Sequence, residues 1–380
     1  MSKIVYDSNC NNFPTLPTIL PAAERIIAIG DVHGDMKLVI DTLVISKLII
    51  PTKIKSNSVT VTIKNIKYNY SWIGGNTIVV QIGDQNDGCR PKNGTCDHID
   101  SDYPDDIPIF EFFTLLHELA LKDGGGVYSL IGNHELMNVS GDFKYTSNAN
   151  INIFKKYTDP FTSKVYSGNN FDQAKEHRMI AFQNGNQHAN YIGCTRQSVL
   201  IVGDFLFIHA GINEFFLKNF RGREHLHKLN KLVKNWLLKK LNEISVDQDI
   251  LNKLINDAND SPFWTRVLGQ LPAHLPYSDR RCKELLAPII SAYKIKGMVI
   301  GHTPQTIDGI NGTCGNKLFR IDVGASKAFE ERREPQVLEI MKLNDGNYKY
   351  TVIFQKEEVY ESIVPDDITS FGRVESRLPN

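Results

Sequence analysis

Short apolar runs that end in glycine alternate with longer amphipathic stretches along the first half of the chain. Residues 25–29, 77–82 and 126–131 are such runs, and each is followed by glycine and polar residues, a pattern that predicts buried strands. Between them, residues 36–48 and 109–122 place apolar side chains at helical spacing. Strands that alternate with helices predict an α/β layered fold.

The second half of the chain is less regular. Residues 148–190 are polar and rich in asparagine, which predicts an insertion or lid. The other patterns predict a hairpin at 58–72 that turns near 64–65, two strands at 198–208, a long helical stretch at 215–255, strands at 296–300 and 318–323, and a hairpin at 337–354.

Charge and hydropathy exclude two classes of protein. The 43 Lys and Arg residues balance the 43 Asp and Glu residues, so bulk electrostatics does not indicate a nucleic-acid-coating protein. No stretch approaches the roughly 18 consecutive apolar residues of a membrane helix, and residues 1–12 lack the apolar run of a secretory signal. We therefore expect a soluble, intracellular protein, most simply a cytoplasmic one, with neither nucleic acid nor membrane as a partner.

Six cysteines lie far apart in the sequence, at Cys10, Cys89, Cys96, Cys194, Cys282 and Cys314. In a chain of 380 residues, this spacing does not predict a disulfide framework. Cys89 and Cys96 share a loop and could pair or bind a ligand, although two free thiols are the simpler interpretation.

The candidate chemistry follows the predicted strands. Asp, His or Asn comes directly after each of five strands, with glycine beside it to let the backbone turn. In α/β folds, ligands gather at the carboxyl ends of strands. A mixture of oxygen and imidazole ligands suits Mn, Fe or Zn, whereas an all-oxygen set suits Mg or Ca. The five blocks are Gly30-Asp31-Val32-His33-Gly34, Gly83-Asp84-Gln85-Asn86-Asp87-Gly88, Gly132-Asn133-His134-Glu135, His209-Ala210-Gly211 and Gly301-His302-Thr303-Pro304.

This ordered set resembles the signature of the calcineurin-like metallophosphoesterases, over roughly residues 26–326. Each block alone would indicate only a strand-end turn or a helix cap, but five blocks in the family's order are specific. The resemblance implies a four-layer α/β/β/α sandwich of two mixed β-sheets flanked by helices. It also implies a catalytic domain at 24–356 with insertions near 50–76 and 141–190, an N-terminal extension at 1–23 and a C-terminal tail at 357–380.

The resemblance implies two divalent metal ions, Mn, Fe or Zn. Asp31 and His33 would hold the first ion, Asp84 would bridge both, and the second would be completed by Asn133, His209 and His302. Such a pair lowers the pKa of bound water, and the resulting bridging hydroxide would attack phosphorus while the cations neutralise phosphoryl charge.

His134 would be the general acid that protonates the leaving group, with Asp87 holding its other ring nitrogen. The simpler alternative for Asp87 is a turn carboxylate at Gly88, and Glu135 is interpreted as structural. Ser/Thr phosphatases of the superfamily carry an arginine directly after the second aspartate, where this chain has Gly88.

Two arginines are candidates for the phosphate clamp, because a guanidinium can grip two phosphoryl oxygens. Arg90 lies two residues beyond the family position. Arg266, in Trp264-Thr265-Arg266, is similar to an element of bacterial-type members. A surface ion pair is the alternative for either residue, and Arg196 and Arg320 are interpreted as structural.

The end of the core, with Gly301-His302-Thr303-Pro304 and then Asp322-Val323-Gly324, resembles the bacterial-like, Shewanella-like protein phosphatases. Diesterase and nuclease members usually have a second histidine where this chain has Pro304. The resemblance thus implies a phosphate monoesterase acting on a phosphorylated protein (Ser/Thr or Tyr) or a small phosphate ester. A diadenosine-tetraphosphatase-like hydrolase and a non-catalytic metal-binding scaffold are the alternatives, and the sequence does not specify an oligomeric state.

Overall fold

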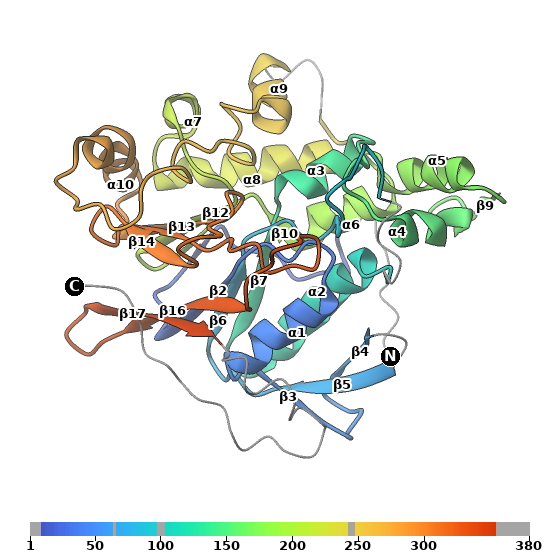
Figure 1. Ribbon diagram of the computed structural model, residues 1–380, viewed down its shortest axis with the longest axis horizontal. Coiled ribbons are helices and arrows are strands. Elements are labelled where there is room, and N and C mark those ends of the chain that lie inside the picture. The colour runs from blue at the N-terminus through green and yellow to red at the C-terminus, as the bar shows by residue number, and fades with distance from the viewer. Residues whose placement is uncertain (1–8, 64–65, 97–102, 242–247, 355–380) are drawn as a thin grey trace.

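The computed structural model of the protein describes residues 9–63, 66–96, 103–241 and 248–354, and the predicted tail at 357–380 lies outside them (Figure 1). Two six-stranded sheets form its centre. The first has the order β10-β7-β6-β2-β16-β17. Strands β2, β6 and β7 run parallel, as the apolar runs with intervening helices predicted. Its strands are β2 (Arg25–Ile29), β6 (Ile78–Gln81), β7 (Gly126–Leu130), β10 (Arg196–Gln197), β16 (Gln336–Lys342) and β17 (Tyr348–Phe354).

The second sheet has the order β1-β11-β12-β13-β15-β14. Here β12, β13 and β15 run parallel, so their carboxyl ends also meet at one edge. The predicted pair around Gly203 is present as β11 and β12, which run antiparallel. The strands are β1 (Ile19–Leu20), β11 (Val199–Val202), β12 (Phe205–Ile208), β13 (Gly297–Ile300), β14 (Asn311–Thr313) and β15 (Leu318–Arg320).

The alternation of side chains along β12 shows how the layers stack. Phe205 and Phe207 belong to the core shared with the first sheet, whereas Leu206 and Ile208 belong to a second core with helices. Successive side chains of a strand point to opposite faces, so the second sheet is covered on both sides. The first core also takes in α1 (Met36–Ile45) and α2 (Asp106–Lys122). The predicted α/β/β/α arrangement is therefore confirmed (Figure 1).

Helices of the second core cover the outer face of the second sheet, as the upper half of Figure 1 shows. The predicted helical stretch over 215–255 is present, but its described part is divided into three shorter helices. Gly222 separates the first two with a φ of 95°, which a continuing helix cannot adopt. The outer helices are α3 (Asn133–Val139), α5 (Phe171–Phe182), α6 (Gln187–Thr195), α7 (Glu214–Phe220), α8 (Arg223–Leu237), α9 (Gln248–Asn256) and α10 (Ala287–Tyr293), which follows a π-helical turn at Cys282–Leu286.

Two smaller sheets lie in the segments that we expect to be insertions. A three-stranded sheet of order β3-β5-β4 contains the predicted hairpin, with β3 (Ile49–Pro51), β4 (Val59–Ile63) and β5 (Ile66–Trp72). A two-stranded sheet pairs β8 (Lys156–Thr158) with β9 (Val165–Ser167), beside α4 (Asn148–Asn152) and a 3₁₀ turn at Ile153–Lys155.

The prediction about the cysteines is wrong. All six pair, as Cys10–Cys194, Cys89–Cys96 and Cys282–Cys314. Spacing along the chain concealed this because the first pair joins residues 184 positions apart, which the fold brings together. Disulfides persist mainly in oxidising compartments, so this pairing weighs against a reducing cytoplasm as the place where the chain works.

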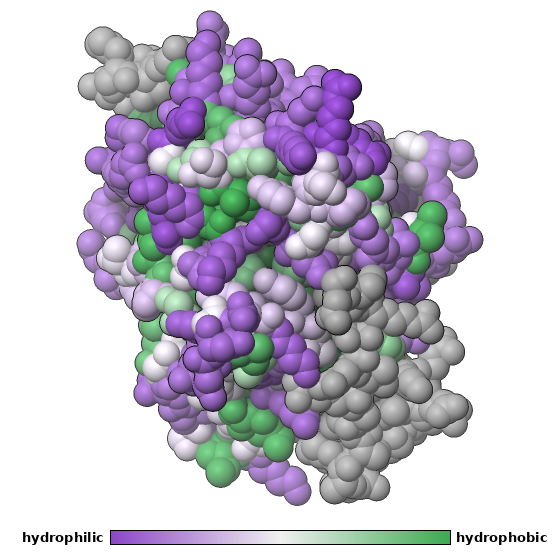
Figure 2. Space-filling view, turned by 90° about the vertical axis from the view of Figure 1, so that its left-hand side faces the viewer, coloured by the Kyte–Doolittle hydropathy of each residue, from purple (hydrophilic) through white to green (hydrophobic). Residues whose placement is uncertain are grey.

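The face of the molecule shown in Figure 2 is mostly polar. Hydrophilic residues dominate the face in Figure 2, and hydrophobic ones form smaller areas between them, as is ordinary for a water-exposed surface. Within the described ranges, each helix is too short or too polar to span a bilayer.

Candidate active site

The predicted site residues come from the carboxyl ends of both central sheets. Asp31 and His33 follow β2, Asp84 and Asp87 follow β6, and the remaining three segments follow β7, β12 and β13. All of the predicted ligands and His134 are buried. The fold thus brings together eight residues that are spread over 272 positions of the sequence: Asp31, His33, Asp84, Asp87, Asn133, His134, His209 and His302.

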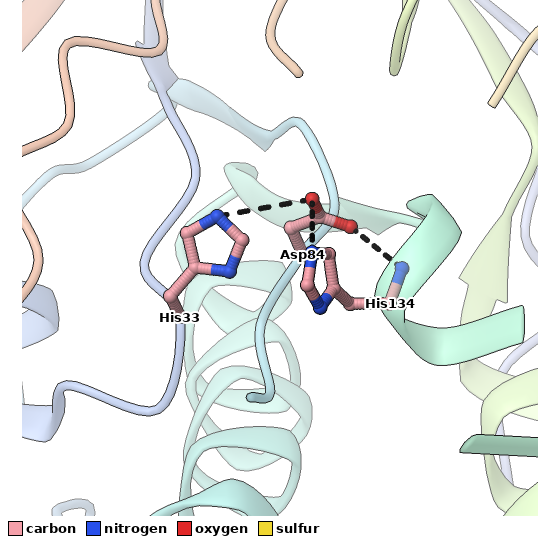
Figure 3. A group of neighbouring side chains, drawn as sticks. All are labelled: His33, Asp84 and His134. Atoms are coloured by element: carbon pink, nitrogen blue, oxygen red, sulfur yellow. Dashed lines mark hydrogen bonds and ion pairs between the residues drawn. The ribbon is translucent and has the colours of Figure 1, made fainter. Parts of the chain in front are cut away.

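Asp84 lies at the centre of this group (Figure 3). Its Oδ2 atom is 3.3 Å from Nε2 of His209 and 3.9 Å from Nε2 of both His33 and His134. Its Oδ1 atom accepts a hydrogen bond from the backbone N–H of His134 at 3.0 Å. One carboxylate therefore faces three imidazoles from three different segments.

A second group of donors also includes Asp84. His209 places Nε2 3.1 Å from Oδ1 of Asn133, and its Nδ1 atom lies 2.9 Å from the carbonyl oxygen of Ile82. Asp84, His209 and His302 bring their donor atoms within 4.8 Å of one another. His33, Asp84 and His134 form another such triplet.

Asp31 contacts one residue of each triplet, His302 and His33. Its Oδ2 atom accepts from the backbone N–H of His302 at 3.0 Å and lies 4.0 Å from Nε2 of His33. A Cβ added at Gly301 would come within 2.3 Å of Oδ1 of Asp31, so the close approach requires glycine there.

Four of these residues have a strained backbone conformation. His33, Asp84, Asp87 and His302 all have positive φ values, of 40°, 54°, 71° and 65°. Residues other than glycine rarely adopt this conformation, and such strain clusters at functional sites where the surrounding structure imposes it. Glu135 helps to impose it, because its carboxylate accepts hydrogen bonds from the backbone N–H groups of Asp84 and Gln85.

The charges in the group shift one another's ionisation. Burial, with Asp322 and Asp84 nearby, raises the pKa of Asp31 well above its ordinary value. Burial also opposes ionisation of Asp84, but the charges of His209 and His134 outweigh it and hold the Asp84 pKa well below its ordinary value. Burial lowers the pKa of His33 and His302, whose rings are favoured in the neutral form that binds metals.

Two observations indicate that these residues fit a pair of divalent cations. Asp31 Oδ1 and Asp322 Oδ2 are buried and have no hydrogen-bond partner among the described residues, and a bound cation would compensate such oxygens. The donors are carboxylate, imidazole and amide, a set that suits Mn, Fe or Zn.

His134 and Asp87 form a buried pair beside the predicted ligands. Nδ1 of His134 lies 2.8 Å from Oδ2 of Asp87. Burial lowers the pKa of His134, but the carboxylates of Asp84 and Asp87 outweigh burial and raise it. The pair is therefore suited to hold a proton on the imidazole.

Asp87 is fixed by residues that the sequence patterns did not identify. Asn138 donates to both carboxylate oxygens of Asp87, at 2.9 and 3.0 Å, and Thr146 Oγ1 donates to Oδ1 at 2.7 Å. Asn138 lies four positions after His134 on α3, so helical spacing could have indicated it. For Thr146 we find no sequence signal.

Behind Asn138 lies the fully buried Arg178. It donates to Asn138 Oδ1 at 2.7 Å and forms an ion pair with Asp106 at 2.8 Å. Asp106 in turn accepts from the backbone N–H of Asp87 at 3.2 Å. The segment around α5 is thereby linked to the His134–Asp87 pair through buried polar contacts.

We expect Arg178→Met to lower the free energy of unfolding by about 3–5 kcal/mol, because it breaks the buried ion pair with Asp106 and removes the hydrogen bonds from Arg178 to Asn138. Denaturant unfolding would measure the change. The matched control is Arg280→Met, since Arg280 forms its ion pair with Glu284 at the exposed surface and should show no measurable change. A loss below about 1 kcal/mol in the Arg178 variant would contradict the expectation.

The two candidate phosphate-binding arginines lie at different ends of the group. Arg90 is half-buried and places Nη2 2.9 Å from Nε2 of His33. Arg266 donates from Nη1 to the carbonyl oxygen of His302 at 2.9 Å. Arg196 and Arg320 are buried and donate to protein oxygens, in keeping with structural roles.

Comparison with known proteins gives a consistent result. The sequence model of the family described as "Calcineurin-like phosphoesterase" matches residues 24–306. "Uncharacterized protein R398" of Acanthamoeba polyphaga mimivirus is 36% identical in an alignment of 259 residues that covers 65% of this chain and 99% of that protein. Shewanella-like protein phosphatase 2 of Arabidopsis thaliana is 26% identical in an alignment of 383 positions that covers 94% of this chain and 85% of that protein.

A solved structure shows the same fold. The cold-active protein-tyrosine phosphatase of a psychrophilic Shewanella species has a TM-score of 0.56 at 20% sequence identity, covering 88% of this chain and 82% of that chain. At this level of identity, the likeness shows the fold alone.

Proposed function

The chain belongs to the calcineurin-like phosphoesterase family, and from this premise we propose that it is a dinuclear-metal phosphate monoesterase acting on phosphorylated protein. The observation that carries the proposal is the position of Asp84, whose carboxylate belongs to both triplets of candidate metal ligands. The names of the Arabidopsis relative and of the Shewanella structure, both protein phosphatases, support a phosphoprotein substrate.

Asp31, His33 and Asp84 would hold one cation, and Asp84, Asn133, His209 and His302 would hold the other. When bound, two such cations supply an activated water and neutralise charge on the phosphoryl oxygens. The Nδ1 atom of His209 and the backbone N–H of Asp84 are already hydrogen-bonded within the protein. These contacts orient both ligands without a bound ion.

His134 would donate its proton to the leaving oxygen. Asp87, held by Asn138 and Thr146, keeps the imidazole oriented and favours its protonated form. A histidine that donates to a carboxylate can also serve as a metal ligand, and the expected behaviour of His134→Asn, argued below, separates the two roles.

Arg90 and Arg266 would grip the phosphate from the His33 side and from the His302 side. Arg90 now lies against the His33 nitrogen that a cation would take. The guanidinium of Arg90 and a cation cannot both use the lone pair of His33 Nε2. Cation binding would therefore free Nη2 of Arg90 to bind phosphoryl oxygens.

Pro304 favours a terminal phosphate, because it occupies the position where diesterase members carry a further histidine. We expect protein that is stripped of metal and reloaded with Mn to hydrolyse p-nitrophenyl phosphate but not bis-p-nitrophenyl phosphate. Equal or faster turnover of the diester would overturn the monoesterase proposal.

Physiological substrate class would be tested by comparing phosphoserine and phosphotyrosine peptides with a dinucleoside tetraphosphate. Preference for either peptide supports a phosphoprotein phosphatase. Preference for the dinucleotide would overturn that part of the proposal while leaving the metal chemistry intact.

A further inference from the structure

The loop that carries Arg90 is closed by a disulfide. Cys89 and Cys96 flank it, seven positions apart, and Cys89 is fully buried. The backbone N–H of Cys89 donates to the carbonyl oxygen of Tyr145 at 3.1 Å, and Sγ of Cys96 lies 3.8 Å from the carbonyl oxygen of Lys144. Both ends of the loop therefore lie against the same neighbouring segment, and Cys89 is hydrogen-bonded to it.

Arg90 is held in place from several sides within this loop. Its guanidinium lies 4.5 Å from the ring centre of Phe329 and 5.3 Å from that of Tyr145. Its Nη1 atom donates to the carbonyl oxygens of Asp87 and Cys89, at 3.3 and 2.9 Å. Only Nη2 reaches a predicted metal ligand, His33.

The position where the Ser/Thr phosphatases carry their arginine has little room in this fold. A Cβ at Gly88 would lie 3.2 Å from the carbonyl oxygen of His33, a tighter contact than most side chains make. An arginine that arrives two residues later has to reach the site from a different backbone path, and the closed loop supplies that path.

We propose that the Cys89–Cys96 disulfide positions Arg90 for phosphate binding, and that a dithiol weakens this binding by opening the loop. The proposal rests on the proposed function, since it assigns the phosphate clamp of that same site. In the step, the S–S bond breaks and two thiols form. The two electrons and two protons come from a dithiol such as dithiothreitol, which becomes its cyclic disulfide.

The effect follows from chain entropy and geometry. A cross-link removes conformational freedom from the loop that it closes, so the opened loop samples more backbone states. The charge-assisted contacts of an arginine to phosphate depend on the placement of its fork, and displacement of about 1 Å can cost up to roughly a hundredfold in rate. The disulfide is therefore a positioning element and does not itself touch the substrate.

The test uses the oxidised full-length protein with Mn, p-nitrophenyl phosphate as substrate and inorganic phosphate as a competitive inhibitor. We expect Cys89→Ala/Cys96→Ala to raise both KM and the inhibition constant of phosphate by roughly three- to tenfold, with a smaller change in kcat and retained metal content. The matched controls are Cys282→Ala/Cys314→Ala and Cys10→Ala/Cys194→Ala, which remove disulfides outside this loop. Melting temperatures of all three variants show whether each is folded.

A second arm repeats the loop variant in an Arg90→Ala background. If the disulfide acts through Arg90, removing it there causes no further loss, so the two effects are strongly non-additive. Treatment of the wild-type protein with dithiothreitol should reproduce the rise in KM, and the Cys89→Ala/Cys96→Ala variant should not respond to it.

The outcomes separate this inference from the proposed function. Unchanged KM and phosphate inhibition in the folded loop variant, or full additivity with Arg90→Ala, would overturn the role of the disulfide while the wild-type phosphatase activity stands. Absence of metal-dependent activity in the oxidised wild-type protein would instead overturn the proposed function, and this inference with it.

Discussion

Asp84→Asn is expected to lower kcat/KM for p-nitrophenyl phosphate by at least roughly a thousandfold, and to release bound metal as well. Asp84 belongs to both triplets of candidate metal ligands, and its Oδ2 atom lies 3.3 Å from Nε2 of His209 and 3.9 Å from Nε2 of His33. Asparagine keeps the shape but removes the negative charge that two cations would share.

We expect Asp84→Asn to leave the backbone conformation unchanged. Asp84 has a φ of 54°, a region that asparagine tolerates better than most residues. The amide oxygen can still accept from the backbone N–H of His134, so α3 should keep its place. A large loss would therefore report on charge and not on misfolding.

Metal content, measured by mass spectrometry of the purified protein, and steady-state kinetics would check the expectation. The matched control is Asp159→Asn, because Asp159 is also a buried carboxylate that accepts from a backbone N–H, here that of Phe161. The control should keep both metal and activity. An Asp84 variant that retained two metals and near-normal turnover would show that the carboxylate does not bridge the ions.

How far the sequence predicted the site depends on the range of the interactions involved. The strands before Asp31, Asp84 and Asn133 were identifiable because burial on both faces gives continuous apolar runs. The polar residues at their carboxyl ends come directly after these runs in the sequence. Parallel pairing then necessarily brings those ends to one edge of the sheet. Local pattern thus sufficed to predict an α/β layered fold and polar residues gathered at its strand ends, whereas the four-layer arrangement was implied by the family resemblance.

The features that the sequence did not predict depend on contacts between distant segments, and the sequence of one segment does not indicate the other. Arg178 reaches Asp106 across 72 positions, and nothing near either residue indicates the other. Cys10 and Cys194 are further apart still. Asp322 lay in a motif that was recognised, yet only the structure shows its buried carboxylate, with a pKa raised to about 6 chiefly by burial.

Local breaks were harder to place than the elements themselves. The apolar spacing over 215–255 is helical almost throughout, but the positive φ of Gly222 ends one helix before α8 begins. Residues 106–108 precede the predicted start of α2, yet they form its first turn. Pro108 is tolerated there because proline has no backbone N–H, and the N–H groups of a first turn have no acceptor within the helix.

His134→Asn is expected to lower kcat by roughly 10²–10⁴-fold for substrates with poor leaving groups, while the protein keeps its metal. The Nε2 atom of His134 faces Asp84, and its Nδ1 atom is occupied by Asp87. A general acid matters most where the leaving oxygen is basic, so the loss should be much larger with phenyl phosphate than with p-nitrophenyl phosphate. His177→Asn is the matched control, since His177 is also buried and bonded through Nδ1, to the carbonyl oxygen of Phe154.

Leaving-group dependence is what distinguishes an acid from a ligand at this position. If His134 held a cation, its loss would remove metal and slow both substrates alike, because nucleophile activation would fail regardless of the leaving oxygen. Asp87→Asn adds a graded case: the imidazole remains, but its carboxylate partner becomes a neutral amide that no longer favours the proton. We expect a smaller loss with the same preference for phenyl phosphate, and equal losses on the two substrates in both variants would show that His134 is not the proton donor.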